Sequence, residues 1–116
     1  MNIHPKISEI KNTIIKTRRD IHKHPELAFK EFRTSELVIN RLKSYGIKIQ
    51  QNIGKTGVLG TLKASNSTKR TIALRADMDA LPIQETGDSA YKSIHKGVMH
   101  ACGHDAHVAM LLGAAE

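Results

Sequence analysis

Side chains that bind metals are concentrated in one short segment, residues 99–110, with the sequence MHACGHDAHVAM. The potential ligands in this segment are His100, Cys102, His104, Asp105 and His107. Thiolate and imidazole are the ligands that zinc and other soft divalent metals prefer. The alternative is a buried free cysteine among surface histidines, but this density of ligands favours a metal site.

The spacing within this segment predicts a turn followed by a helix. Cys102 and His104 are two residues apart, which does not place them on one helical face but suits a tight turn through Gly103. The helix is expected to begin at His104 or Asp105, and the positive potential at its N-terminus favours the thiolate form of a nearby cysteine. Asp105 could cap that helix or bridge two metals.

A second group of carboxylates follows an apolar segment, in the sequence RADMDALP at residues 75–82. Asp77 and Asp79 lie at the expected end of a strand, where α/β proteins often build their sites. An aspartate there can bind a metal or orient a ligand histidine. It can equally make a local bond in a turn, and the sequence alone leaves both readings open.

A third candidate is the pair His22 and His24, which stands immediately before Pro25. Two histidines at this spacing have the form of a metal-binding pair. However, the residue before a proline disfavours helical geometry, so the pair also marks the end of a helix. We favour the second interpretation.

Two helices are expected in the first half of the chain. Residues 7–21 carry apolar side chains at spacings of three, four and seven, the pattern of one helical face. These side chains are Ile7, Ile10, Ile14 and Ile21. Arg18 falls on the same face, so its guanidinium either extends to solvent or meets a carboxylate. A second helix is predicted over residues 30–44, with Gly46 as its terminator.

The pattern then changes to one that is typical of strands. Residues 47–53 alternate between apolar and polar side chains. Two further apolar segments, residues 58–64 and 71–76, are predicted to pair as an antiparallel hairpin across a polar turn at 64–69. Residues 82–97 are expected to form an irregular surface segment.

The last helix is strongly apolar. Val108, Leu111 and Leu112 lie in it, and we expect them to need a covering element from elsewhere. The pattern reaches Glu116 without the glycine and polar residues that usually end a helix. We therefore expect the chain to be the front part of a larger domain.

Length and composition indicate a globular protein. The 116 residues suffice for at most one ordinary domain, and 40% hydrophobic with 25% charged residues is typical of a folded chain. The sequence holds no apolar run near the ~18 residues that a membrane helix needs. The first twenty residues lack the apolar segment of a secretory signal, so we expect a cytoplasmic protein. A single cysteine excludes an internal disulfide.

The net charge of +7 raises the question of an acidic partner. Aromatic residues make up only 3% of the chain, which leaves little to stack on nucleic-acid bases. The lysines are also dispersed along the sequence and do not form one block. We therefore expect a solvated basic surface, with neither nucleic acid nor a membrane as partner.

Three segments of the chain together resemble one family. They are RRDIHKHPELAFKEFRTSELV at residues 18–38, LRADMDALPIQE at 74–85 and MHACGHDAHVAMLLGAA at 99–115. Their sequence, order and spacing resemble the M20D metallopeptidase-like amidohydrolases, which include hippurate hydrolases and N-acyl-amino-acid amidohydrolases. The resemblance covers nearly the whole chain, and the last two motifs are highly specific.

The resemblance implies an α/β fold, the N-terminal part of a zinc-peptidase-like catalytic domain in which helices pack on a mixed β-sheet. Residues 1–116 would form the N-terminal portion of this domain. The lid or dimerisation domain and the C-terminal part of the catalytic domain would lie outside them. Complete members of the family are often homo-oligomers.

The resemblance also implies a site for two divalent metal ions, with Zn, Mn, Co or Ni as candidates. Cys102 and His104 match the two ligands of the family motif, and Asp79 matches an aspartate that supports them without binding the metal. Three further ligands, a glutamate and two histidines, come later in the family, as does the glutamate that activates water. None of these later residues is within the 116 residues.

The implied activity is hydrolysis of small N-acyl amino acids by a metal-activated water. The isolated chain is expected to be inactive, because it holds only two of the ligands. The alternative is a catalytically dead remnant that acts at most as a small basic binding protein. Which N-acyl amino acid is the substrate does not follow from the sequence.

Overall fold

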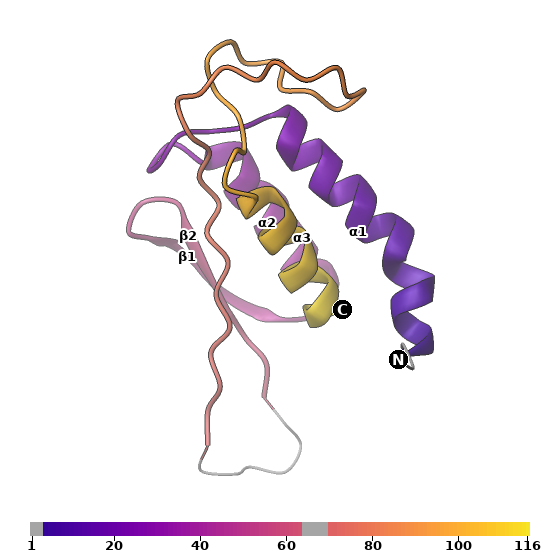
Figure 1. Ribbon diagram of the computed structural model, residues 1–116. Helices are drawn as coiled ribbons and strands as arrows, with labels where there is room; N and C mark the ends of the chain where they lie inside the picture. Colours follow the sequence, from indigo (N-terminus) through magenta and orange to yellow (C-terminus); the bar gives the residue numbers. More distant parts are fainter. Residues whose placement is uncertain (1–3, 64–69) are drawn as a thin grey trace.

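The computed structural model describes residues 4–63 and 70–116 and shows an α/β fold (Figure 1). The elements follow one another as α1 (Pro5–Lys23), α2 (Phe32–Ser44), β1 (Lys48–Ile53), β2 (Gly57–Thr61) and α3 (His104–Ala115). All three predicted helices are confirmed, with boundaries that differ from the sequence pattern by only a few residues.

The helix α1 buries the face that the isoleucine pattern predicts. Ile21 is fully buried and Ile10 is 9% exposed, whereas Ile7, in the first turns, is 51% exposed. The helix ends at Lys23, with His24 as its C-cap, so the prediction of a helix exit before Pro25 is confirmed. Arg18 meets a carboxylate, that of Asp105.

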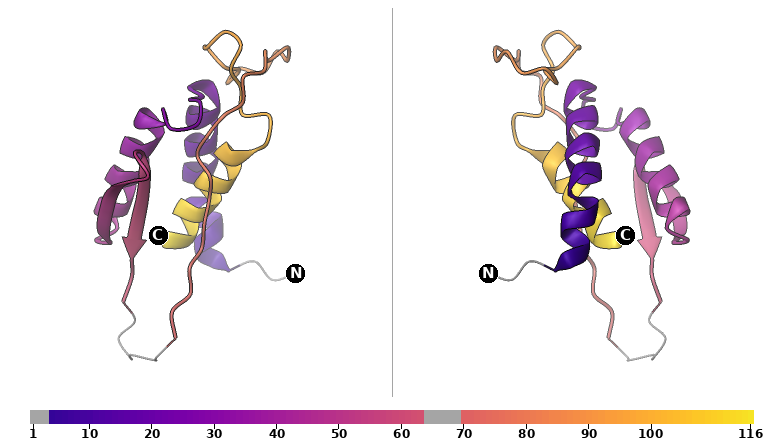
Figure 2. Two further views of the ribbon diagram at one scale, coloured as in Figure 1. Left: turned by 90° about the vertical axis from the view of Figure 1, so that its left-hand side faces the viewer. Right: turned by 90° about the vertical axis from the view of Figure 1, so that its right-hand side faces the viewer.

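The core lies where α3 packs between α1 and α2 (Figure 2). Its buried members come from all of these elements and from the residue before β1: Ile21, Leu42, Ile47, Val108 and Leu112. The expectation that Val108 and Leu112 need a cover from elsewhere is therefore wrong, because α1 and α2 already bury them to 3% and 6% exposure.

The sheet of the described residues is an antiparallel hairpin of β1 and β2. The predicted hairpin of residues 58–64 with 71–76 is wrong, since β2 pairs with β1 and residues 70–76 form no strand. The turn between β1 and β2 is shorter than the predicted connection, so its closure costs less entropy. The polar turn expected at 64–69 lies outside the described residues.

Residues 70–79 run in an extended line past α3 toward the end of the molecule where α1 ends (Figure 1). Ile72 and Leu74 in this segment are 86% and 70% exposed. Residues 82–97 are irregular, as predicted, and return the chain to the start of α3. None of the helices in the described part of the chain is long and apolar enough to cross a membrane.

Candidate metal centre

The turn of residues 100–104 carries both predicted ligands. Cys102 is exposed on this turn, and His104 is the first residue of α3, as the sequence predicts. Gly103 between them has a φ of 84°, a left-handed conformation that side chains other than glycine adopt at a cost. The turn therefore depends on the residue type that the sequence places there.

Backbone pairing brings Asp79 to this turn. Leu81 and Met99 form an isolated antiparallel bridge, with N–O distances of 3.0 and 3.1 Å between their backbones. The next residue before it, Ala80, donates its amide to the Glu26 carbonyl at 2.7 Å. These bonds fix the backbone on both sides of the site, although neither segment belongs to a regular strand.

Asp79 contacts His104 directly. The Nδ1 atom of His104 lies 2.9 Å from Oδ1 of Asp79 and 3.0 Å from its backbone oxygen. Both partners are acceptors, so Nδ1 carries the proton and donates to them. The lone pair of this imidazole is then on Nε2, the atom that remains available for a metal.

Asp77, the other carboxylate of the motif, behaves differently. It is exposed and forms an ion pair with Arg75, at 2.8 Å from Nε to Oδ1. The hydrogen bond from Arg75 lowers the pKa of Asp77 below its ordinary value. Of the two readings left open by the sequence, a local bond fits Asp77 and contact with a histidine fits Asp79.

Asp105 is fully buried and pairs with two side chains of α1, the guanidinium of Arg18 and the imidazole of His22. Its Oδ2 atom lies 2.8 Å from Nε of Arg18 and 2.7 Å from Nδ1 of His22. The residue at the helix N-cap is Gly103, with no side-chain cap bond, so the suggestion that Asp105 caps α3 is wrong. As an acidic residue in the first turn it nevertheless interacts favourably with the helix dipole.

His22 is held on both sides by carboxylates. Its Nε2 atom lies 3.0 Å from Oε1 of Glu85, opposite the bond to Asp105. His24, its neighbour in the sequence pair, bonds to the backbone oxygen of Asp20 at 2.8 Å. Both histidines are thus occupied by protein groups, and the metal-pair reading of this motif has no support in the described residues.

Glu85 is the partner that sequence reasoning did not identify. It lies in the irregular segment, is 8% exposed, and also accepts a 2.7 Å hydrogen bond from the Ser93 amide. Burial raises the pKa of this carboxyl, but the bonds from His22 and Ser93 outweigh it, and the pKa lies below its usual value. Its place as the last residue of the LRADMDALPIQE segment is the signal that could have drawn attention to it.

His100 is buried beside this group, with 4% exposure. Neither of its ring nitrogens has a hydrogen-bond partner among the described residues, and neither does Oδ1 of Asp105. Burial lowers the pKa of His100, a shift that the nearby Asp105 carboxylate partly opposes. A buried, neutral imidazole next to a half-satisfied carboxylate is unusual, because such atoms are nearly always bonded.

The donor chemistry fits part of a metal site. A thiol and the Nε2 atom of an Asp79-bound imidazole are suitable donors for zinc, manganese, cobalt or nickel. Within residues 4–63 and 70–116, however, no three His, Cys, Asp or Glu side chains are grouped so as to hold a metal. Catalytic zinc sites use about three protein ligands per metal, so further donors are required.

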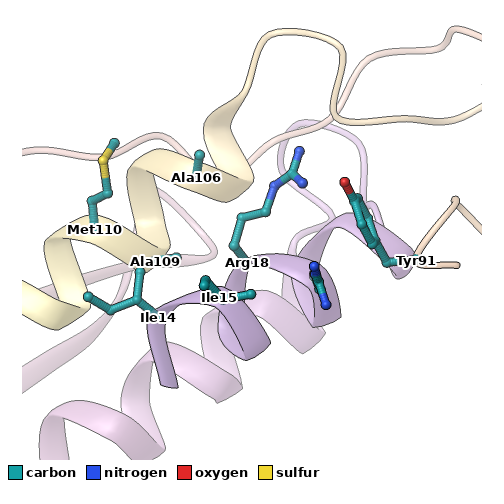
Figure 3. Close-up of a pocket in the computed structure, with 8 residues that line it drawn as sticks. Ile14, Ile15, Arg18, Tyr91, Ala106, Ala109 and Met110 are labelled. Carbon is teal, nitrogen blue, oxygen red and sulfur yellow. The ribbon is translucent and has the colours of Figure 1, made fainter. Parts of the chain in front are cut away.

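A shallow, mostly apolar groove runs between α1 and α3 (Figure 3). It is lined by Ile14, Ile15, Arg18, Arg19, Tyr91, Ala106, Ala109 and Met110. None of the predicted ligands is among these residues, so the groove is separate from the turn that carries them.

The fold resembles that of a known metal enzyme. It matches the crystal structure of a dinuclear metal-binding peptidase of the M20 family from Bacillus subtilis, with a TM-score of 0.87 and 41% sequence identity. This match covers 93% of the present chain and 30% of that protein. In addition, residues 73–116, which contain Asp79, Cys102 and His104, match the model of peptidase family M20/M25/M40. Residues 73–116 thus carry the pattern of the M20 peptidase family.

Relatives within the family have hydrolase names. The chain is 54% identical to thermostable carboxypeptidase 2 of Saccharolobus solfataricus, over 94% of the chain and 28% of the relative. It is 51% identical to the hippurate hydrolase of Campylobacter jejuni, over 100% of the chain and 30% of that enzyme. The 116 residues thus span less than a third of the length of these relatives.

Proposed function

We propose that residues 1–116 are the N-terminal portion of an M20 catalytic domain that hydrolyses the amide bond of small N-acyl amino acids. The proposal is supported by the family, by the names of relatives such as hippurate hydrolase, and by the arrangement of the site. The observation that carries it is the contact between Asp79 and His104, 2.9 Å long, on the turn that also exposes Cys102.

Each of the three residues has a distinct role in this proposal. The Cys102 thiolate and Nε2 of His104 are donors to divalent cations, and the Asp79 carboxylate holds His104 with Nε2 free. Asp79 also increases the basicity of that nitrogen by accepting the Nδ1 proton. When bound, the metal ions would supply a water of lowered pKa and would polarise the scissile carbonyl.

The site needs donors beyond those of the described residues. We propose that these, and the group that takes the proton from water, come from the part of the domain that relatives possess beyond this stretch. We further propose a cytoplasmic protein that acts on a small molecule, with neither nucleic acid nor a membrane as partner. The proposed metal is one of Zn, Mn, Co and Ni.

A chimera tests this proposal. The matching segment of the Campylobacter hippurate hydrolase, which aligns with all 116 residues at 51% identity, is replaced by the present chain. We expect the chimera to hydrolyse N-benzoylglycine with added metal, and the 116 residues alone to be inactive. Cys102→Ser and His104→Ala should each abolish the activity, whereas Asp77→Asn, a change of an exposed carboxylate, should not.

Two outcomes would contradict the proposal. A folded chimera without activity would indicate an inactive remnant, the alternative that the two-donor site leaves open. Turnover by the isolated chain that is lost in Cys102→Ala would show that the missing donors are not needed.

A further inference from the structure

The buried carboxylate of Asp105 follows His104 directly in the chain, and it is held more firmly than either predicted ligand. Its exposure is 0%, and both Arg18 and His22 donate to the same oxygen, Oδ2, at 2.8 and 2.7 Å. Figure 3 shows the guanidinium of Arg18 reaching up from α1 between Ala106, in the first turns of α3, and the ring of Tyr91. The start of α3 is therefore tied to the last turns of α1.

His22 is itself fixed in orientation. Its two ring nitrogens lie 2.7 Å from Asp105 and 3.0 Å from Glu85, so one imidazole bridges two carboxylates. Both bonds are satisfied together only when both nitrogens carry protons. The imidazole also packs against Tyr91 with the two rings nearly perpendicular and 5.4 Å between the ring centres. A ring with contacts on these sides cannot rotate without breaking at least one of them.

The turn that carries the predicted ligands is thus held from two sides. Asp79 binds the imidazole of His104, and α1 binds the carboxylate of the next residue, Asp105. Between Cys102 and His104 stands Gly103, whose backbone has more conformational freedom than any other residue type. The turn is not rigid by itself, so its shape depends on these two attachments.

A buried ion pair is a poor means of stabilising a fold. Removing the charges from water costs roughly as much free energy as the pairing returns. Well-packed apolar side chains at these positions would stabilise the helix contact at least as well. The charged arrangement does have one property that apolar packing lacks, because it fixes the direction of the Asp105 side chain and with it the adjoining backbone.

We propose that Asp105 is a positioning residue, held by His22 and Arg18, that sets the turn so that Cys102 and His104 can bind one divalent cation together. This inference rests on the proposed function, since it requires these two residues to be donors. It assigns a role to the RRDIHKH segment, whose histidine pair is otherwise only a helix exit.

The test is a titration of the chain with Co²⁺, which gives a thiolate-to-cobalt absorption band when Cys102 binds. His22→Asn places an amide donor where Nδ1 stands and keeps the bond to Asp105. His22→Gln places the donor where Nε2 stands and keeps only the bond to Glu85. We expect His22→Asn to retain the cobalt affinity and His22→Gln to weaken it about tenfold, the usual effect of removing a bond behind a metal ligand.

Further variants keep the test decisive. Asp20→Asn is the matched control, a carboxylate of the same helix that is 39% exposed and paired with Arg33, and it should leave the affinity unchanged. If His22→Gln fails to fold by circular dichroism, Arg18→Gln replaces it, because Arg18 is 33% exposed and tolerates change. This variant loses the Nε bond to Asp105 and should weaken cobalt binding several-fold.

The outcomes separate this inference from the proposed function. Equal affinities for His22→Asn and His22→Gln, or an unchanged affinity in Arg18→Gln, would overturn the positioning role while the wild type still binds cobalt. Absence of the cobalt band in the wild type would instead overturn Cys102 as a donor, and the inference with it.

Discussion

Two polar clusters lie near the loop that joins α1 to α2, and they are built on different principles. The cap cluster consists of Glu26, Glu31, Thr34 and Thr56. In it, Glu26 accepts bonds from the amides of Arg33 and Thr34 and from the Thr34 hydroxyl, at 2.8–2.9 Å. Glu31 accepts from the Thr56 hydroxyl at 2.6 Å and from the Phe29 amide at 2.9 Å.

The site cluster consists of His22, Glu85, His100 and Asp105. Both of its carboxylates bond to His22, and Asp105 also pairs with the guanidinium of Arg18. The cluster also holds three of the four buried side-chain atoms that have no bonding partner in the described residues, the fourth being Ser89 Oγ. A carboxylate that accepts bonds from neutral amide and hydroxyl donors stabilises the start of a helix. Burying charged groups while some polar atoms stay unbonded instead costs free energy of folding. The comparison indicates that the cap cluster makes a net contribution to stability. The site cluster makes little net contribution, although removing one of its partners is costly, and its bonds fix the position of Asp105.

The largest expected effect is that of removing the central side chain of the site cluster. His22→Ala leaves the carboxylates of Asp105 and Glu85 buried without their shared partner, which should cost about 3–5 kcal/mol in the free energy of unfolding. Asp20→Ala, at an exposed pair, should cost about 1 kcal/mol or less. Urea unfolding followed by circular dichroism measures both, and similar small losses would mean that the site cluster contributes no strong interaction.

A smaller loss is expected from the cap cluster. Glu26→Ala removes the acceptor for two amides at the start of α2, which should cost about 2 kcal/mol in unfolding free energy. Cobalt affinity should stay unchanged in the molecules that remain folded. Glu36→Ala, an exposed change on the same helix, is the control. If Glu26→Ala lowered the affinity for cobalt, the distinction between the two clusters would be lost.

The smallest expected effect is a loss of stability at acid pH through Glu85. The pKa of Glu85 in the folded state lies below its ordinary 4.5, in a setting where His22 and Lys92 face it. A carboxyl with a depressed folded pKa stabilises the fold above its ordinary pKa, and this stability is lost as the pH falls through the folded pKa. The stability advantage of the wild type over Glu85→Gln should therefore shrink below pH 4.5. If the difference in unfolding free energy between the wild type and Glu85→Gln stayed constant from pH 7 to acid pH, the pairing of Glu85 with His22 would be contradicted.

The sequence predicted those features that depend on local patterns. The start of α3 at His104 followed from a glycine turn before an apolar run. The ion pair of Arg18 was one of two outcomes expected for a charge on an apolar face. The Asp79 contact was one of two alternatives that a carboxylate after an apolar segment allows. Each of these inferences needs only nearby residues and their spacing.

The features that the sequence did not reveal depend on residues that are far apart in the chain and come together only in the fold. Glu85 and His22 are 63 residues apart, and no periodicity connects an irregular loop to a helix end. The buried ring of His100 likewise lies beside that of His22, far away in the sequence, with 6.3 Å between the ring centres. The hairpin error has the same origin, because local apolar runs do not say which neighbour a strand selects.

The most direct test of the central claim uses the single cysteine as a reporter. Cys102 is exposed, so iodoacetamide near neutral pH should alkylate it in the metal-free chain. Because Cys102 and His104 are proposed to bind the same cation, zinc or manganese should slow alkylation in the wild type and not in His104→Ala. A wild-type rate that is indifferent to metal would contradict the account, because Cys102 would then be a structural thiol and not a metal donor.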